Sequence, residues 1–352
     1  MVANKSFLFK EIPAFAPEAG KTVATEVREF DLDQDPPANG AIVKGLYFSL
    51  DPSFRFRMHG PEVKSYAPGF KLDEPFAGYA IVQILKSNHD KVAVGDVVFG
   101  RFEVAEYSVA TADTLGLSIT RKIDNSFGVP LSNFLGILGT TGLAAYASLY
   151  EIGKPKKGET IFISSAAGAI GQIVGQIAKH EGLKVIGSVG DDTKLDFILK
   201  ELGFDGGWNY KKEKTHDALK RLAPEGLDIY YENVGGEQLE AAIDNMKPYG
   251  RIIGCGMISQ YNLPPDEKYG VKNLMSLVAK RVTFQGFIVG DPGFGPKYYN
   301  ERNENIGAWL AEGSIKSKEH IVDGMDKAPE ALVAMLEGKS LGKTIVKVAD
   351  PE

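Results

Sequence analysis

One segment constrains the fold of this chain more than any other: a glycine-containing turn between an apolar strand and an amphipathic helix. It spans residues 160–179, with the sequence TIFISSAAGAIGQIVGQIAK. Gly168 would let the backbone approach a pyrophosphate, and Gly171 would let the helix pack tightly on the strand. The start of the helix offers free N–H groups and a partial positive charge to phosphates. We therefore predict a dinucleotide-binding loop, although Ala166 stands where the usual fingerprint has its first glycine.

The residues after the next strand indicate which dinucleotide binds. A site that prefers NAD places a carboxylate at the end of this strand. Here the strand 184–187 is followed by Ser188, and Lys194 comes shortly afterwards. A hydroxyl and an ammonium group suit a 2′-phosphate, whereas Asp191 and Asp192 are better placed to cap the following helix. The pattern predicts NADPH, and the alternative is that Lys194 is an ordinary solvated lysine on the helix surface.

The rest of the chain divides into two patterns. Residues 1–130 are rich in strands and turns, with strand candidates at 41–49, 76–85 and 97–99. From about residue 131, an apolar helix (131–150) precedes an alternation of short strands and helices, which is typical of a parallel sheet covered on both faces. The strands are predicted at 160–164, 184–187, 227–232 and 251–254, and the helices at 169–181, 193–202 and 236–246. Two helix candidates and a strand at 344–348 follow residue 305, and this strand could return to the first domain.

The predicted fold class is therefore α/β. A β-rich domain comprises residues 1–130 and 305–352, and a Rossmann domain with a doubly wound parallel sheet is inserted at residues 131–304.

Composition narrows the function classes. Of the 352 residues, 43% are hydrophobic and 24% are charged, as in ordinary globular proteins, and the net charge of −6 argues against nucleic acid as a partner. The single cysteine excludes a disulfide framework and a zinc site built on several thiolates. Residues 1–13 lack the apolar core of a secretion signal, and the apolar stretch 134–150 is short for a bilayer. We expect a cytoplasmic protein that does not interact with membranes.

We exclude two other classes of dehydrogenase for this chain. Zinc alcohol dehydrogenases share the two-domain layout, but their metal needs thiolate and imidazole ligands, and the corresponding stretch 49–52 reads Ser-Leu-Asp-Pro. The five histidines are scattered without ligand spacing, so we predict no metal. The segment 210–214 matches the Tyr-x-x-x-Lys spacing of short-chain dehydrogenases. We reject that role because their glycine loop lies at the start of the chain, whereas here it lies in the middle.

Four motifs together resemble a known family. They are LDPSFRFRM (50–58), AAGAIGQIVGQ (166–176), YENVGG (231–236) and GRIIGCGMISQYN (250–262). The chain resembles, over nearly its whole length, the zinc-independent medium-chain dehydrogenases/reductases of the leukotriene B4 12-hydroxydehydrogenase, prostaglandin reductase and plant double-bond reductase group. This resemblance implies a GroES-like fold for the first domain.

The resemblance also implies roles for particular residues. Lys194 and Tyr210 would contact the 2′-phosphate of NADPH, and residues 287–289 would lie near the nicotinamide. Tyr79 and Tyr261 would face the substrate, although the residues alone do not distinguish them from ordinary amphipathic surface tyrosines. The predicted catalytic residue is Tyr261, and the predicted substrate-binding residues are Tyr79, Ser53 and Phe287. The predicted cofactor-binding residues are Gly168, Ala169, Ile170, Gly171, Ser188, Lys194, Tyr210, Asn233, Cys255, Gly256, Ser259, Phe287, Val289 and Ser340.

Two positions depart from the family pattern. Ser53 replaces a tyrosine that commonly follows Asp-Pro, which opens the pocket or removes a phenol contact. Ser340 replaces an asparagine that commonly precedes the C-terminal Gly-Lys, which weakens or rearranges one cofactor contact.

The function implied is the NADPH-dependent reduction of a carbon–carbon double bond conjugated to a carbonyl, with hydride passing to the β-carbon. The partner is then a small α,β-unsaturated aldehyde or ketone. One alternative is an NADPH-dependent quinone reductase of the same superfamily. Another is a non-catalytic NADPH-binding redox sensor or scaffold. The oligomeric state is open, with a homodimer as the candidate.

Overall fold

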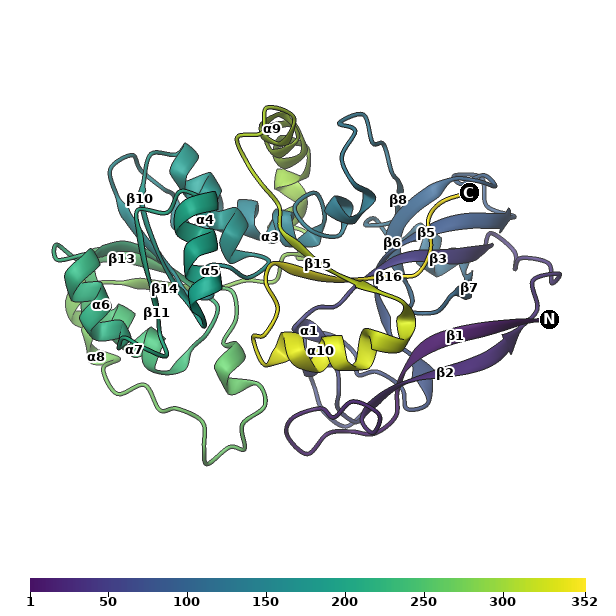
Figure 1. The fold of residues 1–352 in the computed structure, drawn as a ribbon, viewed down its shortest axis with the longest axis horizontal. Coiled ribbons are helices and arrows are strands. Elements are labelled where there is room, and N and C mark those ends of the chain that lie inside the picture. The colour runs from purple at the N-terminus through teal and green to yellow at the C-terminus, as the bar shows by residue number, and fades with distance from the viewer. The chain divides into compact units, whose positions relative to one another are not determined.

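The computed structural model describes all residues from Met1 to Glu352, and they form two compact units. The first unit comprises Met1–Leu135 and Glu319–Glu352, and the second comprises Gly136–Lys318. The second unit is thus an insertion in the chain of the first. The mixed α/β fold class predicted from the sequence is confirmed (Figure 1).

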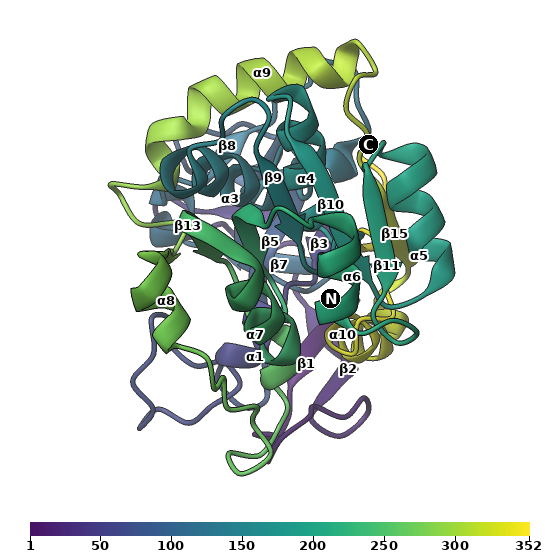
Figure 2. The same cartoon turned by 90° about the vertical axis from the view of Figure 1, so that its left-hand side faces the viewer.

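The sheet of the second unit has six strands, all parallel, in the order β11-β10-β9-β12-β13-β14. Numbered within the unit, this is the 3-2-1-4-5-6 order of a doubly wound dinucleotide-binding sheet. Figure 2 labels β9, β10, β11 and β13 of this sheet. Phe162 lies at its centre, stacked on Tyr230 with ring centroids 4.7 Å apart. The strands are β9 (Thr160–Ile163), β10 (Lys184–Val189), β11 (Gly206–Asn209), β12 (Leu227–Glu232), β13 (Met246–Gly254) and β14 (Thr283–Gly286).

The helices of the second unit pack on these strands. Helix α4 packs on β9 and β10, α6 on β11, and α7 on β12. The α-helices are α3 (Thr140–Ser148), α4 (Gly171–His180), α5 (Asp192–Asp196), α6 (Thr215–Leu222), α7 (Gly236–Asn245), α8 (Met275–Lys280) and α9 (Tyr299–Ala311). Shorter π and 3₁₀ turns are η2 (Leu149–Gly153), η3 (Phe197–Glu201), η4 (Ile258–Gln260) and η5 (Gly295–Tyr298). The sequence patterns missed β11, β14, α6 and α8.

The predicted domain boundary at residue 305 needs correction, because it falls inside α9, which belongs wholly to the second unit. Hydrogen bonds hold α9 against α3. The Tyr146 hydroxyl donates to Glu301 Oε1 at 2.6 Å, and Asn305 Nδ2 donates to the Tyr146 oxygen at 2.7 Å. The chain therefore returns to the first unit only at Glu319.

The prediction of one continuous helix at 131–150 is wrong. The chain forms a 3₁₀ turn, η1 (Leu131–Phe134), then a glycine-rich turn, and only then α3. The Gly142 N–H donates to the Gly136 carbonyl at 3.1 Å, and a Cβ at Gly142 would lie 1.7 Å from the Ile137 oxygen. The glycines thus permit a tight turn that a continuous helix would not contain.

The first unit holds two sheets. The larger has the order β15-β16-β3-β5-β6-β8 with β7 also paired to β3, and the smaller has the order β2-β1-β4. The C-terminal strand pairs antiparallel with β3, with Ile345 opposite Ser49, so it returns to the first unit as expected. The strands are β1 (Val2–Phe9), β2 (Val23–Phe30), β3 (Ala41–Ser49), β4 (Glu74–Pro75), β5 (Ala77–Ser87), β6 (Val97–Glu103), β7 (Tyr107–Ala110), β8 (Arg121–Lys122), β15 (Glu319–Asp323) and β16 (Lys343–Lys347).

The core between these sheets is strongly aromatic. Phe76 is fully buried, and its ring centroid lies 4.7 Å from those of Phe7 and Phe70 and 5.3 Å from that of Phe54. The helical elements are α1 (Ser53–Phe56), α2 (Ala112–Gly116), η6 (Met325–Lys327) and α10 (Ala328–Leu336). No helix of the chain has both the length and the apolar character needed to cross a membrane.

Candidate nucleotide and substrate site

The loops that follow β9, β10, β12 and β13 lie at one edge of the parallel sheet, because the carboxyl ends of parallel strands share an edge. Strand β9 pairs with both β10 and β12. Successive strands are added on one side of β9 up to β11 and on its other side from β12 on, so the strand order reverses between β9 and β12. Open α/β sheets bind ligands at this switch point.

Ser164 joins the loop after β9 to the loop after β12, on the two sides of the switch point, by hydrogen bonds. It follows β9 and is fully buried. The Asn233 N–H donates to its hydroxyl at 2.9 Å, and Asn233 Nδ2 donates to its carbonyl at 2.8 Å. The predicted cofactor residue Asn233 is therefore held at the switch point by the backbone and side chain of the neighbouring loop.

Glu232, which sequence reasoning missed, shapes the loop after β12. It is fully buried, and its Oε1 accepts the N–H groups of Val234 at 2.6 Å and Gly235 at 2.8 Å. Burial raises the pKa of this carboxyl, while the two backbone bonds act in the opposite direction. Gly235 and Gly236 have φ values of 76° and 60°, so the turn that starts α7 requires glycine. A buried-strand carboxylate directly before Asn-x-Gly-Gly was the signal available in the sequence.

The glycine loop has the close backbone packing that its sequence predicts. A Cβ on Gly171 would lie 2.4 Å from the Ser165 oxygen and 2.8 Å from the Ala166 Cα, so only glycine fits. Gly168 is nearly as tight, at 3.0 Å from the Ser165 oxygen. No side chain caps the following helix α4, and its Gln172 and Val174 N–H groups donate to the Gly168 and Ile170 carbonyls, so the close backbone packing of the loop is what would admit a phosphate. This arrangement fits a pyrophosphate group.

The departure at Ala166 has a structural explanation. Ala166 is fully buried, and a Cβ at Gly187 on the adjacent β10 would lie 2.5 Å from the Ala166 methyl carbon. The methyl group therefore occupies the space that the missing side chain of Gly187 leaves. Glycine at position 187 on the neighbouring strand thus makes room for alanine at the first fingerprint position.

Two of the predicted 2′-phosphate contacts come together after β10. Lys194 is only 8% exposed, which contradicts its alternative interpretation as a solvated surface lysine, and its Nζ lies 3.5 Å from Asp191 Oδ2. Asp191 caps α5 as predicted, because its Oδ1 accepts the Lys194 N–H at 2.9 Å. Tyr210 lies on the other side, with its hydroxyl 3.1 Å from the position of a Cβ on Gly190. Lysine and phenol thus flank the end of β10.

Ser188 does not join this group. It is fully buried, and its hydroxyl donates to Gln238 Oε1 at 2.6 Å. The predicted phosphate contact through this side chain is therefore wrong, because the hydroxyl faces α7 and is already satisfied. The Ser188 carbonyl instead accepts the Ala166 N–H at 3.0 Å and helps to shape the glycine loop.

The loop after β13 carries the predicted catalytic tyrosine. The Met257 N–H donates to the Tyr261 hydroxyl oxygen at 3.0 Å, and that oxygen lies 2.6 Å from the position of a Cβ on Gly256. A phenol can accept one hydrogen bond and donate another, so this contact is compatible with a donor role for Tyr261. Ser259 donates to the Val234 carbonyl at 2.5 Å and so ties this loop to the turn after β12.

Cys255 lies at the start of the same loop. Its thiol is close to the Tyr231 hydroxyl, and burial raises its pKa to about 12. A thiol with such a pKa is neutral at physiological pH and a poor nucleophile. Its backbone N–H, which donates to the Glu232 carbonyl at 3.0 Å, helps to set the direction of the loop.

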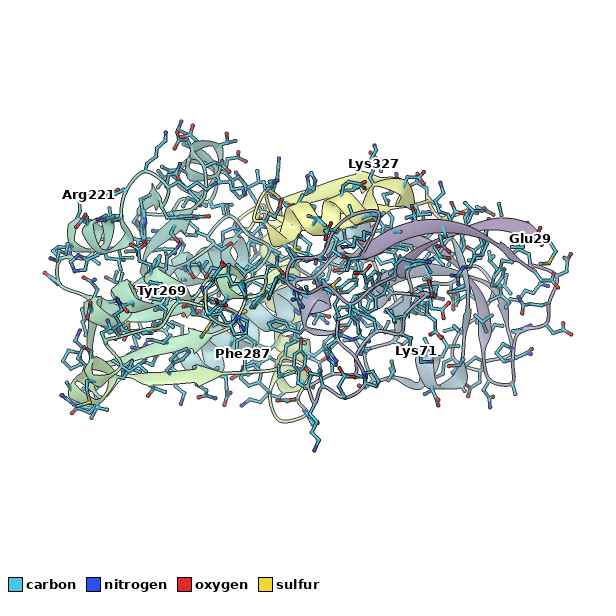
Figure 3. All side chains as sticks on the ribbon, turned by 90° about the horizontal axis from the view of Figure 1, so that it is seen from below. Glu29, Lys71, Arg221, Tyr269, Phe287 and Lys327 are labelled. Atoms are coloured by element: carbon cyan, nitrogen blue, oxygen red, sulfur yellow. The ribbon has the colours of Figure 1, made fainter.

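Phe287 and Val289 follow the edge strand β14. The Phe287 ring stacks on Phe294, with centroids 5.1 Å apart, and the structure places Phe287 at the end of β14 (Figure 3). The Val289 carbonyl lies 2.0 Å from the position of a Cβ on Gly295, so this loop folds tightly back on itself.

The remaining predicted residues belong to the first unit. Tyr79 on β5 stacks on Phe99 of β6, with centroids 5.9 Å apart and an interplanar angle of 8°. Ser53 is the exposed first residue of α1, and Ser340 lies in the turn between α10 and β16.

Lys343, which sequence reasoning missed, holds the Asp-Pro segment. Its side chain is 3% exposed, and its Nζ donates to Asp51 Oδ1 at 2.7 Å and to the Leu50 carbonyl at 2.8 Å. Ser49, at the position where zinc enzymes have a ligand, donates to Asp51 Oδ2 at 2.7 Å. No group of three or more His, Cys, Asp or Glu side chains in the chain could hold a metal ion.

Comparison with known proteins agrees with this geometry. Residues 8–117 match the family model for the N-terminal domain of oxidoreductases, and residues 169–305 match the model for zinc-binding dehydrogenases. An NADP-dependent oxidoreductase, RED1 of Cochliobolus heterostrophus, is 51% identical over 350 residues, which cover 99% of both chains. The chain belongs to the double-bond reductase group of the medium-chain dehydrogenases/reductases.

Two further relatives of this medium-chain dehydrogenase/reductase are informative. The NADP⁺-dependent 2-alkenal reductase of Nicotiana tabacum is 41% identical over 355 residues, covering 99% of this chain and 98% of the relative. The structure of CurA from Vibrio vulnificus, in complex with NADPH, matches with a TM-score of 0.88 and 33% identity over 99% of this chain and all of that one.

Proposed function

We propose that this chain reduces the carbon–carbon double bond of α,β-unsaturated aldehydes and ketones with NADPH. The observation that carries the proposal is the position of the Tyr261 hydroxyl, in the loop after β13, at the same sheet edge as the glycine loop after β9. An alkenal reductase and an NADP-dependent oxidoreductase among the relatives support it.

The second unit fits NADPH. Gly168 and Gly171 give the backbone the close approach that a pyrophosphate needs, and Lys194 and Tyr210 would hold the 2′-phosphate. Asn233, fixed by Ser164, would lie along the dinucleotide at the switch point. When bound, NADPH supplies the hydride that adds to the β-carbon of the substrate.

The role proposed for Tyr261 follows from its hydrogen bond. Adding hydride to the β-carbon leaves negative charge on the carbonyl oxygen, and a donor placed there stabilises the enolate. The Met257 N–H polarises the Tyr261 hydroxyl by donating to its oxygen, which makes the phenol a better donor. Water or a tyrosine then protonates the α-carbon. The conjugated acceptor is already electrophilic, so the reaction needs no metal.

The test is NADPH oxidation against a panel of enals, enones and quinones. We expect turnover with enals and enones, saturated carbonyl products and little activity with quinones. Preferential turnover of quinones would favour the quinone reductase alternative. NADPH binding without oxidation by any acceptor would favour the sensor or scaffold alternative.

A chelator experiment tests the proposed independence from metal. Dialysis against a strong chelator should leave turnover unchanged, because no thiolate or imidazole cluster is available as a ligand set. Loss of activity that added zinc restores would contradict the proposal.

We propose a homodimer as the assembly, formed along β14. All four residues of this edge strand are exposed, and the neighbouring helix α8 exposes Met275 and Val278 at 75% and 67%. An open strand edge beside apolar side chains invites pairing, and a twofold axis lets one surface cover its own copy. Light scattering should give about twice the 38.1 kDa chain mass, and the double variant Met275→Lys with Val278→Lys should give one chain mass. A monomeric wild-type protein would contradict the dimer.

A further inference from the structure

The side chain of Gln260 joins three segments of the second unit. Its Nε2 donates to the Ser259 hydroxyl oxygen at 2.7 Å, and its Oε1 accepts the Tyr269 N–H at 2.8 Å. The Ser259 hydroxyl in turn donates to the Val234 carbonyl at 2.5 Å. The donor side and the acceptor side of the Gln260 amide are thus both used, between the turn after β12, the η4 turn after β13 and the segment that follows η4.

The two glycines of the turn after β12 leave room for this amide. Gln260 Nε2 lies 3.2 Å from the position of a Cβ on Gly236, and Gln260 Cγ lies 3.4 Å from the position of a Cβ on Gly235. Ser259 Oγ also lies 3.4 Å from the Cβ position on Gly236. The Gln260 side chain therefore packs directly against the glycine pair, whose positive φ values the turn already requires.

Tyr261, the proposed catalytic residue, lies between the two segments that Gln260 joins. On its N-terminal side, two backbone N–H groups of η4 donate to carbonyls of the turn after β12 at 3.1 Å. On its C-terminal side, residues 265–270 are all exposed, and the bond from the Tyr269 N–H to Gln260 Oε1 closes this loop. Backbone bonds therefore hold the chain before Tyr261, and the Gln260 side chain holds the chain after it.

The end of that loop is fixed on α7. Glu240 Oε2 accepts the Lys272 N–H at 2.8 Å, and the Glu240 carbonyl accepts a bond from Asn273 Nδ2 at 2.7 Å. Gln260 thus connects the loop that carries Tyr261 to a segment that α7 already holds in place. A residue whose chain is fixed on both sides has fewer positions available to its side chain, which is how supporting residues hold a catalytic group in its productive geometry.

We propose that Gln260 is a positioning residue for Tyr261, because its amide fixes the loop after β13 so that the Tyr261 hydroxyl keeps the place from which it donates to the substrate carbonyl oxygen. A donor that is already in place stabilises the developing charge without reorganisation during the reaction. This inference rests on the proposed reductase function and on the role proposed for Tyr261, and it adds the residue that sets the position of the hydroxyl.

The test is a double-mutant cycle on Gln260 and Tyr261, with the straight-chain 2-enal that the wild-type protein reduces fastest. Gln260→Met keeps an unbranched side chain and removes both hydrogen bonds. We expect kcat and kcat/KM to fall together by about three- to tenfold. KM and NADPH affinity should stay within about threefold, because the bond from Tyr261 develops fully only in the transition state. In Tyr261→Phe, which has no hydroxyl to position, adding Gln260→Met should change kcat by less than about twofold.

Two further variants control for the substitution itself and for folding. Gln34→Met removes a side-chain bond of similar length, from Nε2 to the Asp31 carbonyl at 2.7 Å in the first unit, and should leave turnover unchanged. Gln260→Ala removes the whole amide and should repeat the result of Gln260→Met with and without the Tyr261 hydroxyl. Thermal melting and NADPH titration of each variant check that it is folded.

The outcomes separate this inference from the function on which it rests. If the wild-type protein reduces no 2-enal, the proposed reductase function fails, and the inference fails with it. If the wild-type protein and Tyr261→Phe are equally active, the reductase function stands, but Gln260 has no catalytic hydroxyl to position and the inference is overturned. It is also overturned if Gln260→Met is as active as the wild type, or if this change lowers kcat by the same factor with and without the Tyr261 hydroxyl.

Discussion

The surfaces proposed to bind ligands in the two units are built in different ways. At the carboxyl edge of the second unit, the backbone of the glycine loop would form the ligand surface, and hydrogen bonds of Ser164, Glu232 and Asn233 fix the adjoining loop after β12. On the β5–β6 face of the first unit, side chains such as Tyr79, which stacks on Phe99, would form the surface proposed for the substrate. A surface formed by the backbone requires glycine at particular positions, which the sequence shows. A surface formed by side chains can change with a single substitution. The proposed nucleotide surface of the second unit is therefore more constrained than the proposed substrate surface of the first.

The strongest way to break this comparison is to add one methyl group to the glycine loop. In Gly171→Ala the new Cβ would lie 2.4 Å from the Ser165 oxygen, so the backbone must move away from the phosphate position. We expect NADPH affinity to fall about a hundredfold, measured by fluorescence titration. Gly270→Ala is the control, because nothing lies within 4 Å of a Cβ there. Unchanged affinity in Gly171→Ala would show that the loop does not hold the cofactor by close packing.

Lys194→Ala tests whether a side chain at the carboxyl edge of the second unit's sheet binds the 2′-phosphate. A charge-assisted hydrogen bond to phosphate contributes about 1.5–3 kcal/mol, so NADPH binding should weaken at least about tenfold while NADH binding is spared. Lys200→Ala, which removes an exposed lysine paired with Asp196 at 2.9 Å, should affect neither cofactor. Equal loss for both cofactors in Lys194→Ala would mean that this residue does not read the 2′-phosphate.

Tyr261→Phe tests the chemistry at the same edge. The change keeps the ring but removes the hydroxyl, so kcat/KM should fall about five- to fiftyfold with NADPH affinity nearly intact. The matched control is Tyr269→Phe, in the segment that follows (Figure 3), whose hydroxyl donates to Glu240 Oε1 at 3.1 Å. A fully active Tyr261→Phe beside a poor Tyr261→Ala would show that the residue packs the pocket and donates nothing.

Ser188→Ala should have the smallest effect on binding. Because this hydroxyl donates to buried Gln238, its loss should lower the free energy of unfolding by about 1 kcal/mol and leave the NADPH to NADH affinity ratio unchanged. Denaturant unfolding and cofactor titration measure the two quantities. A changed ratio at unchanged stability would restore Ser188 to the phosphate site.

The sequence predicted the local structure around the proposed nucleotide site well where the backbone forms it. The strand–glycine–helix segment, the cap by Asp191 and the position of Asn233 all follow from local patterns. Prediction failed where a side chain had a choice of partner, as at Ser188, because a strand-end hydroxyl can turn toward a helix as easily as toward a ligand. It also failed at 131–150, where apolar composition concealed a glycine turn between the two units.

The proposed substrate surface of the first unit was predicted least. Residue 101 lies within the run VVFGRFE, and nothing in the sequence indicates that its side chain lies across from Tyr79. That relation depends on the register of two antiparallel strands, and a shift of one residue would place Arg101 on the opposite face. Only the folded sheet shows that this arginine lies beside the predicted substrate tyrosine.

The central claim is that hydride passes from NADPH to the β-carbon of a conjugated carbonyl compound. The most direct measurement uses NADPH deuterated at the transferable position, an enone substrate and mass spectrometry or NMR of the product. The account predicts a saturated ketone with deuterium at the β-carbon. Deuterium on the carbonyl carbon of an allylic alcohol would contradict it.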